Sequence, residues 1–160
     1  MSTNEQIERL MGTFREVNKS YMKILRKDTE ALGTTVMQTR VMRIIKRNPN
    51  IGVLELAERL HLGNSTISSM VDRLVKSGLV ERERLSSDRR SKTLRLTEKG
   101  EQVQNKADQL FLDHLSSLLE NIPEEEMEHL IRTLNKISKI LGERDTNDGE
   151  DRDTAPRATD

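Results

Sequence analysis

The fold of this 160-residue chain is decided by residues 53–97, which read VLELAERLHLGNSTISSMVDRLVKSGLVERERLSSDRRSKTLRLT. The stretch predicts a short helix over residues 53–60, a tight turn, and a second helix that starts at Asn64 or Ser65, where the residue types favour an N-cap. We expect this second helix to end at Gly78, because glycine accepts the left-handed conformation that follows many helices. The pattern is that of a helix-turn-helix.

The second helix has two faces of opposite character. Its apolar residues recur at helical spacing and predict a buried stripe of Ile67, Met70, Val71 and Leu74. The opposite face has no apolar residue and consists of Ser65, Thr66, Ser68, Ser69, Asp72, Arg73 and Lys76. Such a face suits the major groove of DNA, where hydroxyls and arginine reach base edges and lysine reaches phosphates. We expect Arg73 to be the main base reader and Lys76 to contact phosphate.

Two strand candidates follow, at residues 80–84 and 92–96, and they enclose the polar loop SSDRRS at residues 86–91. Alternation in the second strand predicts two leucines facing inward and two polar residues facing outward, namely Leu94 and Leu96, and Thr93 and Arg95. Residues 64–99 hold nine Lys or Arg against five Asp or Glu, a net charge of +4 in a chain whose total is zero. A helix-turn-helix followed by a basic hairpin is a winged helix.

Residues 77–100, SGLVERERLSSDRRSKTLRLTEKG, resemble the wing signature of the MarR family of bacterial transcription regulators. That signature has a G-L-[VI]-x-R strand start, a D-x-R tip and an L-T-x-x-G exit. These are matched in order by Gly78, Leu79, Val80 and Arg82, then Asp88 and Arg90, then Leu96, Thr97 and Gly100. Residues 55–78 resemble the helix-turn-helix of the same family, and the resemblance extends over roughly residues 1–141. It implies a homodimer that binds double-stranded DNA.

The wing tip allows two interpretations of Asp88. It is either a turn former or a carboxylate that pairs with a neighbouring arginine and aims Arg90 outward. The resemblance favours the second, with Arg90 in the minor groove, where a narrow A/T-rich stretch attracts arginine. Arg89 and Arg84 are then expected to contact the phosphate backbone.

Long amphipathic helices flank the winged helix. The first runs to about residue 32, and a second, from about residue 34, has Thr35 and Gln38 placed for a capping box. The helix over residues 53–60 is expected to bury Leu54, Leu56, Ala57 and Leu60. After the wing, Thr97 caps a fifth helix, and Pro123 opens a sixth. The terminal stripes could fold back on a monomer or pair two subunits, and the resemblance favours the dimer.

This pattern predicts a mainly α fold with a small β-hairpin wing, a winged helix-turn-helix between long N- and C-terminal dimerisation helices. We expect one MarR-like domain at residues 1–142, with the winged helix at 34–100 and dimerisation helices at 4–32 and 101–142. Periodicity stops at residue 143, and residues 143–160 hold seven acids and three arginines. This composition predicts a disordered tail. It is either a solubilising segment or an acidic competitor for the basic wing.

Several protein classes are excluded by what the sequence lacks. It contains no cysteine and no apolar run of membrane-spanning length, so we expect a cytoplasmic protein that makes no membrane contact. No histidine lies at i, i+4 from another, and His61, His114 and His129 are expected to be solvated or capping rather than metal ligands. Phosphate-binding glycine loops and nucleophile elbows are missing, so we expect neither cofactor nor enzymatic activity.

Two functions remain after these exclusions. The favoured one is a dimeric, sequence-specific transcription regulator, a repressor of palindromic operators relieved by a small-molecule effector. The resemblance implies that this effector binds between the dimer helices and the winged helix. The alternative is a winged-helix module for protein contacts or nonspecific nucleic-acid binding. The paired arginines at the wing tip and the lack of a Trp or Tyr anchor near the helix-turn-helix favour the regulator.

Overall fold

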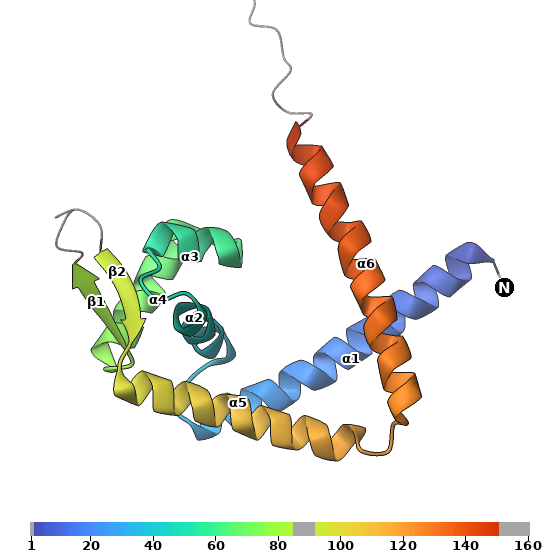
Figure 1. Ribbon diagram of the computed structural model, residues 1–160, viewed down its shortest axis with the longest axis horizontal. Helices are drawn as coiled ribbons and strands as arrows, with labels where there is room; N and C mark the ends of the chain where they lie inside the picture. Colours follow the sequence, from blue (N-terminus) through green and yellow to red (C-terminus); the bar gives the residue numbers. More distant parts are fainter. Residues whose placement is uncertain (1, 85–91, 151–160) are drawn as a thin grey trace, which may run out of the picture. The chain divides into compact units, whose positions relative to one another are not determined.

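The computed structural model describes residues 2–84 and 92–150, with the side chains of residues 84 and 143–150 left out (Figure 1). Its elements in chain order are α1 (Thr3–Ala31), α2 (Val36–Arg47), α3 (Val53–Leu60), α4 (Asn64–Lys76), β1 (Val80–Arg84), β2 (Lys92–Leu96), α5 (Glu98–Leu119) and α6 (Glu124–Glu150). The mainly α fold with a β-hairpin is confirmed. The chain divides into two compact units, Met1–Leu115 and Ser116–Asp160, so α5 crosses the boundary between them. In the part of the chain described, no helix has the length and apolarity needed to cross a membrane.

Reciprocal side-chain bonds fix the starts of the first two helices. The backbone N–H of Gln38 donates to Thr35 Oγ1 at 3.2 Å, and the Thr35 N–H donates to Gln38 Oε1 at 3.0 Å, which confirms the expected capping box. Ser2 and Glu5 form the same arrangement at the start of α1. Each box satisfies two N–H groups that an uncapped helix would leave without a partner.

The turn between α3 and α4 differs in detail from the prediction. Helix α3 ends at His61, whose φ of 53° is left-handed, and the N-cap of α4 is Gly63, which makes no side-chain cap bond. The helix begins at Asn64 as predicted, but the expected capping role of Asn64 or Ser65 is wrong. The Gly63 carbonyl already accepts the N–H of Ile67 at 3.1 Å, so Asn64 and Ser65 lie inside the first turn. Their polar side chains are not used in capping and stay exposed.

The buried core belongs to the winged helix. It is formed by α2, α3, α4, the hairpin and the segment before α3, through Val41, Met42, Ile45, Ile51, Leu56, Ala57, Leu60, Ile67, Val71, Leu74, Leu79, Val80 and Leu94. The predicted stripe of α4 is confirmed, with Met70 only partly buried. The expected burial of Leu54 is wrong, because this side chain is 65% exposed. In α3 the inward face is set by Leu56, Ala57 and Leu60, and Leu54 lies away from it.

The hairpin pairs β1 and β2 antiparallel, from Val80 opposite Leu96 to Arg84 opposite Lys92. A bridge between Ile51 and Leu94 adds a third backbone segment to its inner edge. Leu94 is buried and Arg95 exposed as expected, but Thr93 is also buried. Its hydroxyl donates to the Glu83 carbonyl at 3.4 Å, so this polar side chain is satisfied against the partner strand instead of facing water.

Helix α5 meets α1 and α2 through polar and aromatic contacts. Asp108 Oδ1 accepts Arg43 Nη2 at 2.7 Å, and Asn105 accepts Lys46 Nζ. Toward α1, His114 Nδ1 lies 3.0 Å from a carboxylate oxygen of Asp28, a residue only 4% exposed. The ring of Phe111 meets that of Tyr21 edge-on, with centroids 5.1 Å apart. This part of α5 is therefore attached to the rest of its unit largely by side-chain pairs.

Helix α6 begins after Pro123, whose carbonyl accepts the Met127 N–H at 3.0 Å, as the sequence predicted. It continues to Glu150, so the expected start of a disordered tail at residue 143 is wrong for residues 143–150. Adding one residue to an existing helix requires little free energy, and no proline interrupts this stretch. Residues 151–160 lie outside the described part of the chain.

Candidate nucleic-acid interface

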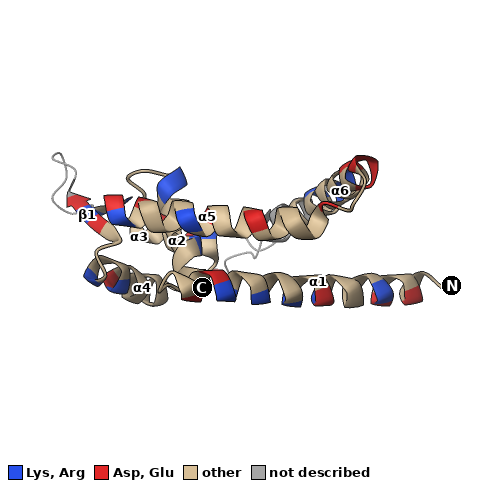
Figure 2. Ribbon diagram, turned by 90° about the horizontal axis from the view of Figure 1, so that it is seen from below, with Lys and Arg blue, Asp and Glu red and all other residues tan. Residues whose placement is uncertain are grey.

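The outward face of α4 is polar along its whole length. Ile67, Val71 and Leu74 are fully buried on one side, so the residues between them point to solvent. Six of the seven residues of the predicted polar face are exposed, and the seventh, Ser68, is half-buried. The first half of the face holds only hydroxyls and Asn64, and the charged residues gather toward the other end of the helix (Figure 2). Arg73 and Lys76 have no ion-pair partner among the described residues, so both cations are available to an anionic ligand.

Asp72 is not available in the same way. Its Oδ1 accepts Arg82 Nη2 of β1 at 2.6 Å, and the side chains are 50% and 29% exposed. The pair links β1, the first strand of the wing, to α4, the proposed recognition helix. It also neutralises the acid that precedes Arg73 in the sequence. Sequence reasoning missed this contact, although Arg82 was part of the motif. Asp72 and Arg82 are ten residues apart and lie in different elements, so neither helical nor strand periodicity could have indicated that they pair.

The hairpin contributes a second cross-strand pair, in which Arg95 Nη1 lies 3.0 Å from Glu83 Oε1. Arg84 stands at the end of β1 opposite Lys92, and the course of its side chain is not described. The predicted tip residues Asp88, Arg89 and Arg90 lie outside the described residues. The roles expected for them stay predictions.

The C-terminal end of α4 is held by the start of α5. Thr97 Oγ1 donates to the Gly78 carbonyl at 2.6 Å and accepts the Gly100 N–H at 3.0 Å, so one hydroxyl both caps α5 and fixes the turn after α4. Lys99 Nζ donates to the Ser77 carbonyl at 3.2 Å. Gly78 has a φ of 72°, a conformation that glycine adopts without a steric penalty.

A glycine is required at position 100 because the start of α5 lies very close to the backbone of Leu79. A Cβ at this position would lie 2.0 Å from the Leu79 carbonyl oxygen, which is backbone and cannot move aside. The spacing of Thr97 and Gly100 in the L-T-x-x-G motif thus has a physical cause. The threonine bonds the turn that follows α4, and the missing side chain lets α5 lie against that turn.

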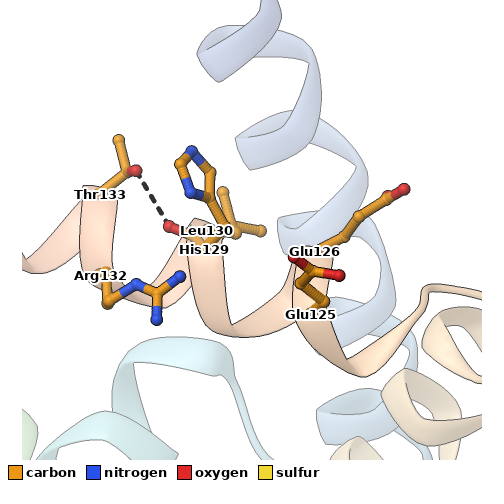
Figure 3. Close-up of a pocket in the computed structure, with 6 residues that line it drawn as sticks. All are labelled: Glu125, Glu126, His129, Leu130, Arg132 and Thr133. Atoms are coloured by element: carbon orange, nitrogen blue, oxygen red, sulfur yellow. Dashed lines mark hydrogen bonds between the residues drawn. The ribbon is translucent and has the colours of Figure 1, made fainter.

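The histidines do not form a metal site. In the described ranges, no three His, Cys, Asp or Glu side chains are grouped to hold a metal ion. His61 is the C-cap of α3, and His114 is exposed as expected, although its Nδ1 also lies 3.0 Å from the buried Asp28. His129 lines a shallow hollow of α6 whose residues are Glu125, Glu126, His129, Leu130, Arg132 and Thr133 (Figure 3). There the Thr133 hydroxyl donates to the His129 carbonyl at 2.9 Å, a bond internal to the helix.

A separate cavity of about 340 Å³ lies between α1 and α2. It is lined by Asn18, Tyr21, Met22, Leu25, Val36, Met37, Thr39, Arg40 and Arg43. This lining combines apolar side chains with Asn18, Thr39 and two arginines, and it contains no acid. No residue spacing placed a cavity here, because its walls come from two helices whose packing is set by tertiary structure, and only the family resemblance pointed to this region.

Comparison with known proteins agrees with this geometry. The MarR family model matches residues 34–92, from the turn before α2 to the start of β2. An uncharacterized HTH-type transcriptional regulator of Bacillus subtilis, YhbI, is 28% identical over 133 residues, which cover 83% of this chain and 86% of the relative. The chain belongs to the MarR family.

Solved MarR structures share the fold. A mutant MarR from E. coli complexed with operator DNA is 27% identical, with a TM-score of 0.70 over 86% of this chain and 99% of that one. A MarR family protein from Bacillus stearothermophilus has the same fold, with a TM-score of 0.81, 23% identity, and coverage of 89% and 99%. As a MarR-family protein, the chain is a DNA-binding transcription regulator with a winged helix and not an enzyme.

Proposed function

We propose that this MarR-family chain acts in the cytoplasm as a homodimer that represses transcription from imperfect palindromic operators and leaves them when a small molecule binds. The observation that carries the proposal is the exposed, polar and apolar-free face of α4, which each subunit offers once. A two-fold dimer presents two such faces related by symmetry, and an inverted repeat is the DNA sequence that matches them.

The dimer is supported by apolar side chains that the single chain leaves uncovered. In α1, Ile7, Leu10, Phe14 and Val17 are 52–62% exposed. In α6, Leu130, Ile131, Leu134, Ile137, Ile140 and Leu141 are 37–59% exposed. Monomeric proteins rarely expose continuous apolar stripes, and covering one with a second subunit contributes about 25 cal/mol per Å². We therefore assign residues 4–32 and 101–142 to dimerisation and 34–100 to the winged helix.

Contacts to DNA are divided between base edges and phosphates. We assign Ser65, Thr66, Ser68, Ser69 and Arg73 to the major groove, since their side chains project from the solvent face of α4. Lys76 and Arg84 are assigned to phosphates, because lysine and strand-end arginine carry charge without a fixed base geometry. A bidentate arginine reads guanine O6 and N7 better than a hydroxyl reads any base, so Arg73 carries most of the discrimination.

The wing tip is assigned to the minor groove. Arg90 enters beside each half-site, Asp88 aims it, and Arg89 contacts the backbone. Asp88→Ala should then weaken operator binding, although the loss of a negative charge alone would strengthen it. Fluorescence anisotropy over a range of salt concentrations decides the sign. Tighter binding of Asp88→Ala at every salt concentration would mean that the wing is only a basic surface.

The small molecule is assigned to the cavity between α1 and α2. This cavity adjoins both a proposed dimerisation helix and the first helix of the winged helix, so a ligand there contacts both parts. Its volume of about 340 Å³ lies within the range of known small-molecule sites. The alternative function, a winged-helix module for protein or nonspecific nucleic-acid contacts, requires no such cavity and no operator.

Selection of bound sites from random duplex DNA, combined with sedimentation at micromolar concentration, tests the proposal. We expect a dimer and a selected site with two inverted half-sites whose centres are about 10–10.5 bp apart. A monomeric chain, or a selected pool without inverted symmetry, would favour the alternative.

A further inference from the structure

Arg43 takes part in two features of the molecule at once. It lines the cavity between α1 and α2, and it forms the ion pair that joins α2 to α5. Both Nε and Nη2 donate to the same oxygen, Asp108 Oδ1, at 3.1 and 2.7 Å. The third nitrogen, Nη1, has no hydrogen-bond partner within the described residues. The guanidinium can therefore be reached from the cavity while it holds α5.

The ion pair is placed where a ligand can compete with it. The Arg43 and Asp108 side chains are 32% and 34% exposed, and pairs at this exposure are weak because water screens them. Gln104 Nε2 donates to the same Asp108 oxygen at 3.1 Å. Asp108 thus keeps one hydrogen bond if Arg43 leaves, which lowers the cost of separation.

The contact region between α2 and α5 is also imperfectly satisfied. Gln104 is fully buried, and its Oε1 has no hydrogen-bond partner in the described part of the chain. A buried acceptor without a donor destabilises the arrangement that contains it. This unsatisfied acceptor favours a rearrangement of the contact region, in contrast to the winged helix, whose buried Thr93 hydroxyl has a hydrogen-bond partner.

The lining of the cavity indicates the chemistry of the ligand. Arg40 and Arg43 give it two positive charges, and none of its nine lining residues is acidic. Met22, Leu25, Val36 and Met37 supply an apolar and adaptable wall, since methionine fills irregular spaces. Tyr21 is the single aromatic residue, and its ring already packs against Phe111. A flexible aliphatic body suits this wall as well as a ring does.

We propose that the cavity binds a small amphiphile with an aliphatic body and a carboxylate, and that this carboxylate replaces Asp108 as the partner of Arg43. The exchange removes the ion pair between α2 and α5 and leaves Lys46–Asn105 as the remaining described side-chain hydrogen bond between these two helices. Because α2 is part of the winged-helix core, the whole winged helix then shifts relative to α5. The ligand exchange itself does not depend on the proposed regulatory function. Only its expected consequence, weaker DNA binding, rests on that function.

Calorimetry on the full chain tests the exchange without DNA. The probe is decanoate, and decanol is the neutral control with the same apolar body. We expect decanoate to bind at least about tenfold more tightly than decanol, since a charge-assisted hydrogen bond to arginine is stronger than a neutral one. Arg43→Gln should remove that preference. Equal binding of the two probes, or no binding of decanoate, would overturn the proposal.

The distinguishing variant is Asp108→Asn, which removes the competing carboxylate and keeps the shape of the side chain. It should bind decanoate about three- to tenfold more tightly than the unmodified chain, because Arg43 no longer has to leave a charged partner. The matched control is Asn105→Ala, which cuts the neighbouring contact to Lys46 without freeing a cavity arginine. Its decanoate affinity should stay within about twofold of that of the unmodified chain.

A merely structural role for Asp108 predicts a different result. Loosening the contact region would then affect both variants alike, and equal decanoate affinities of Asp108→Asn and the unmodified chain would refute the exchange. Circular dichroism confirms that each variant is folded. Anisotropy on the selected operator separates the two levels of the argument. If decanoate binds with the expected Asp108 dependence but leaves DNA affinity unchanged, the exchange stands and effector relief fails.

Discussion

The winged helix and the terminal helices use the same apolar spacing with opposite results. In α4, Ile67, Val71 and Leu74 are completely buried, whereas Phe14 of α1 is 58% exposed and Leu134 of α6 is 43% exposed. The first region completes its core inside one chain, and the second does not. The stability of the winged helix should therefore be independent of protein concentration, whereas in the proposed dimer that of the terminal helices should depend on the second subunit.

The largest effect is expected from Leu74→Ala in the core of the winged helix. Deleting a fully buried leucine removes its transfer free energy and leaves a cavity, which together cost about 2–5 kcal/mol in the free energy of unfolding. Urea denaturation measures this loss. Leu54→Ala is the matched control, because Leu54 lies in the adjacent helix and is 65% exposed. Equal losses for the two variants would break the distinction between a closed and an open region.

A smaller effect on folding but a large one on assembly is expected from Leu134→Asp in α6. A charge in the middle of an apolar interface stays unpaired when the subunits meet, and substitutions at such central positions cost about 2 kcal/mol or more. The dimer dissociation constant should rise at least about thirtyfold by sedimentation. The far-ultraviolet circular dichroism of the winged helix should not change. An undisturbed dimer would show that α6 faces solvent in the assembly.

Local signals in the sequence predicted most of the winged helix. The bounds of α3 and of both strands, the Thr35–Gln38 box and the glycine after α4 depend on neighbouring residues, so their spacing along the chain suffices. Contacts between distant segments could not be read in this way. The Asp72–Arg82 and Asp28–His114 pairs join residues that only the fold brings together, and the period of α3 did not reveal which of its leucines lies outside.

The same reasoning applies to the site. Periodicity separated the polar face of α4 from its buried stripe, and that face is exposed as predicted. It did not reveal that Asp72 is already paired, or that Asn64 and Ser65 take no part in capping. The cavity between α1 and α2 and the double role of Arg43 required the packing of three helices. A side chain that contacts two distant elements leaves no pattern in the order of residues along the chain.

An intermediate effect is expected from Arg73→Ala on the exposed face of α4. Loss of a base-reading arginine should weaken operator binding by about 1–3 kcal/mol and relax the preference at one base pair in each half-site. Lys76→Ala should instead weaken binding to operator and random duplex alike and lower the salt slope by about 1. Anisotropy with both duplexes separates the two. An equal loss on both duplexes for Arg73→Ala would assign this residue to phosphate as well.

The smallest effect is expected from the Asp72–Arg82 pair, which lies on the surface of the winged helix and not in its core. With both side chains partly exposed, the pair should contribute only about 0.2–1 kcal/mol to the free energy of unfolding, measured by a double-mutant cycle of Asp72→Asn and Arg82→Gln.

Its effect on DNA binding has a more informative sign. Asp72→Asn removes an acid beside Arg73 and frees Arg82, so bulk electrostatics predicts tighter binding to every duplex. If the pair instead holds β1 and the wing in register with α4, random DNA should bind more tightly while the ratio of operator to random affinity falls. We expect the second result, because the 2.6 Å contact joins α4 directly to the first strand of the wing. An unchanged ratio would mean that the pair tunes charge alone, and that the register of the wing is set by the hairpin and by the Thr97 hydroxyl that bonds Gly78.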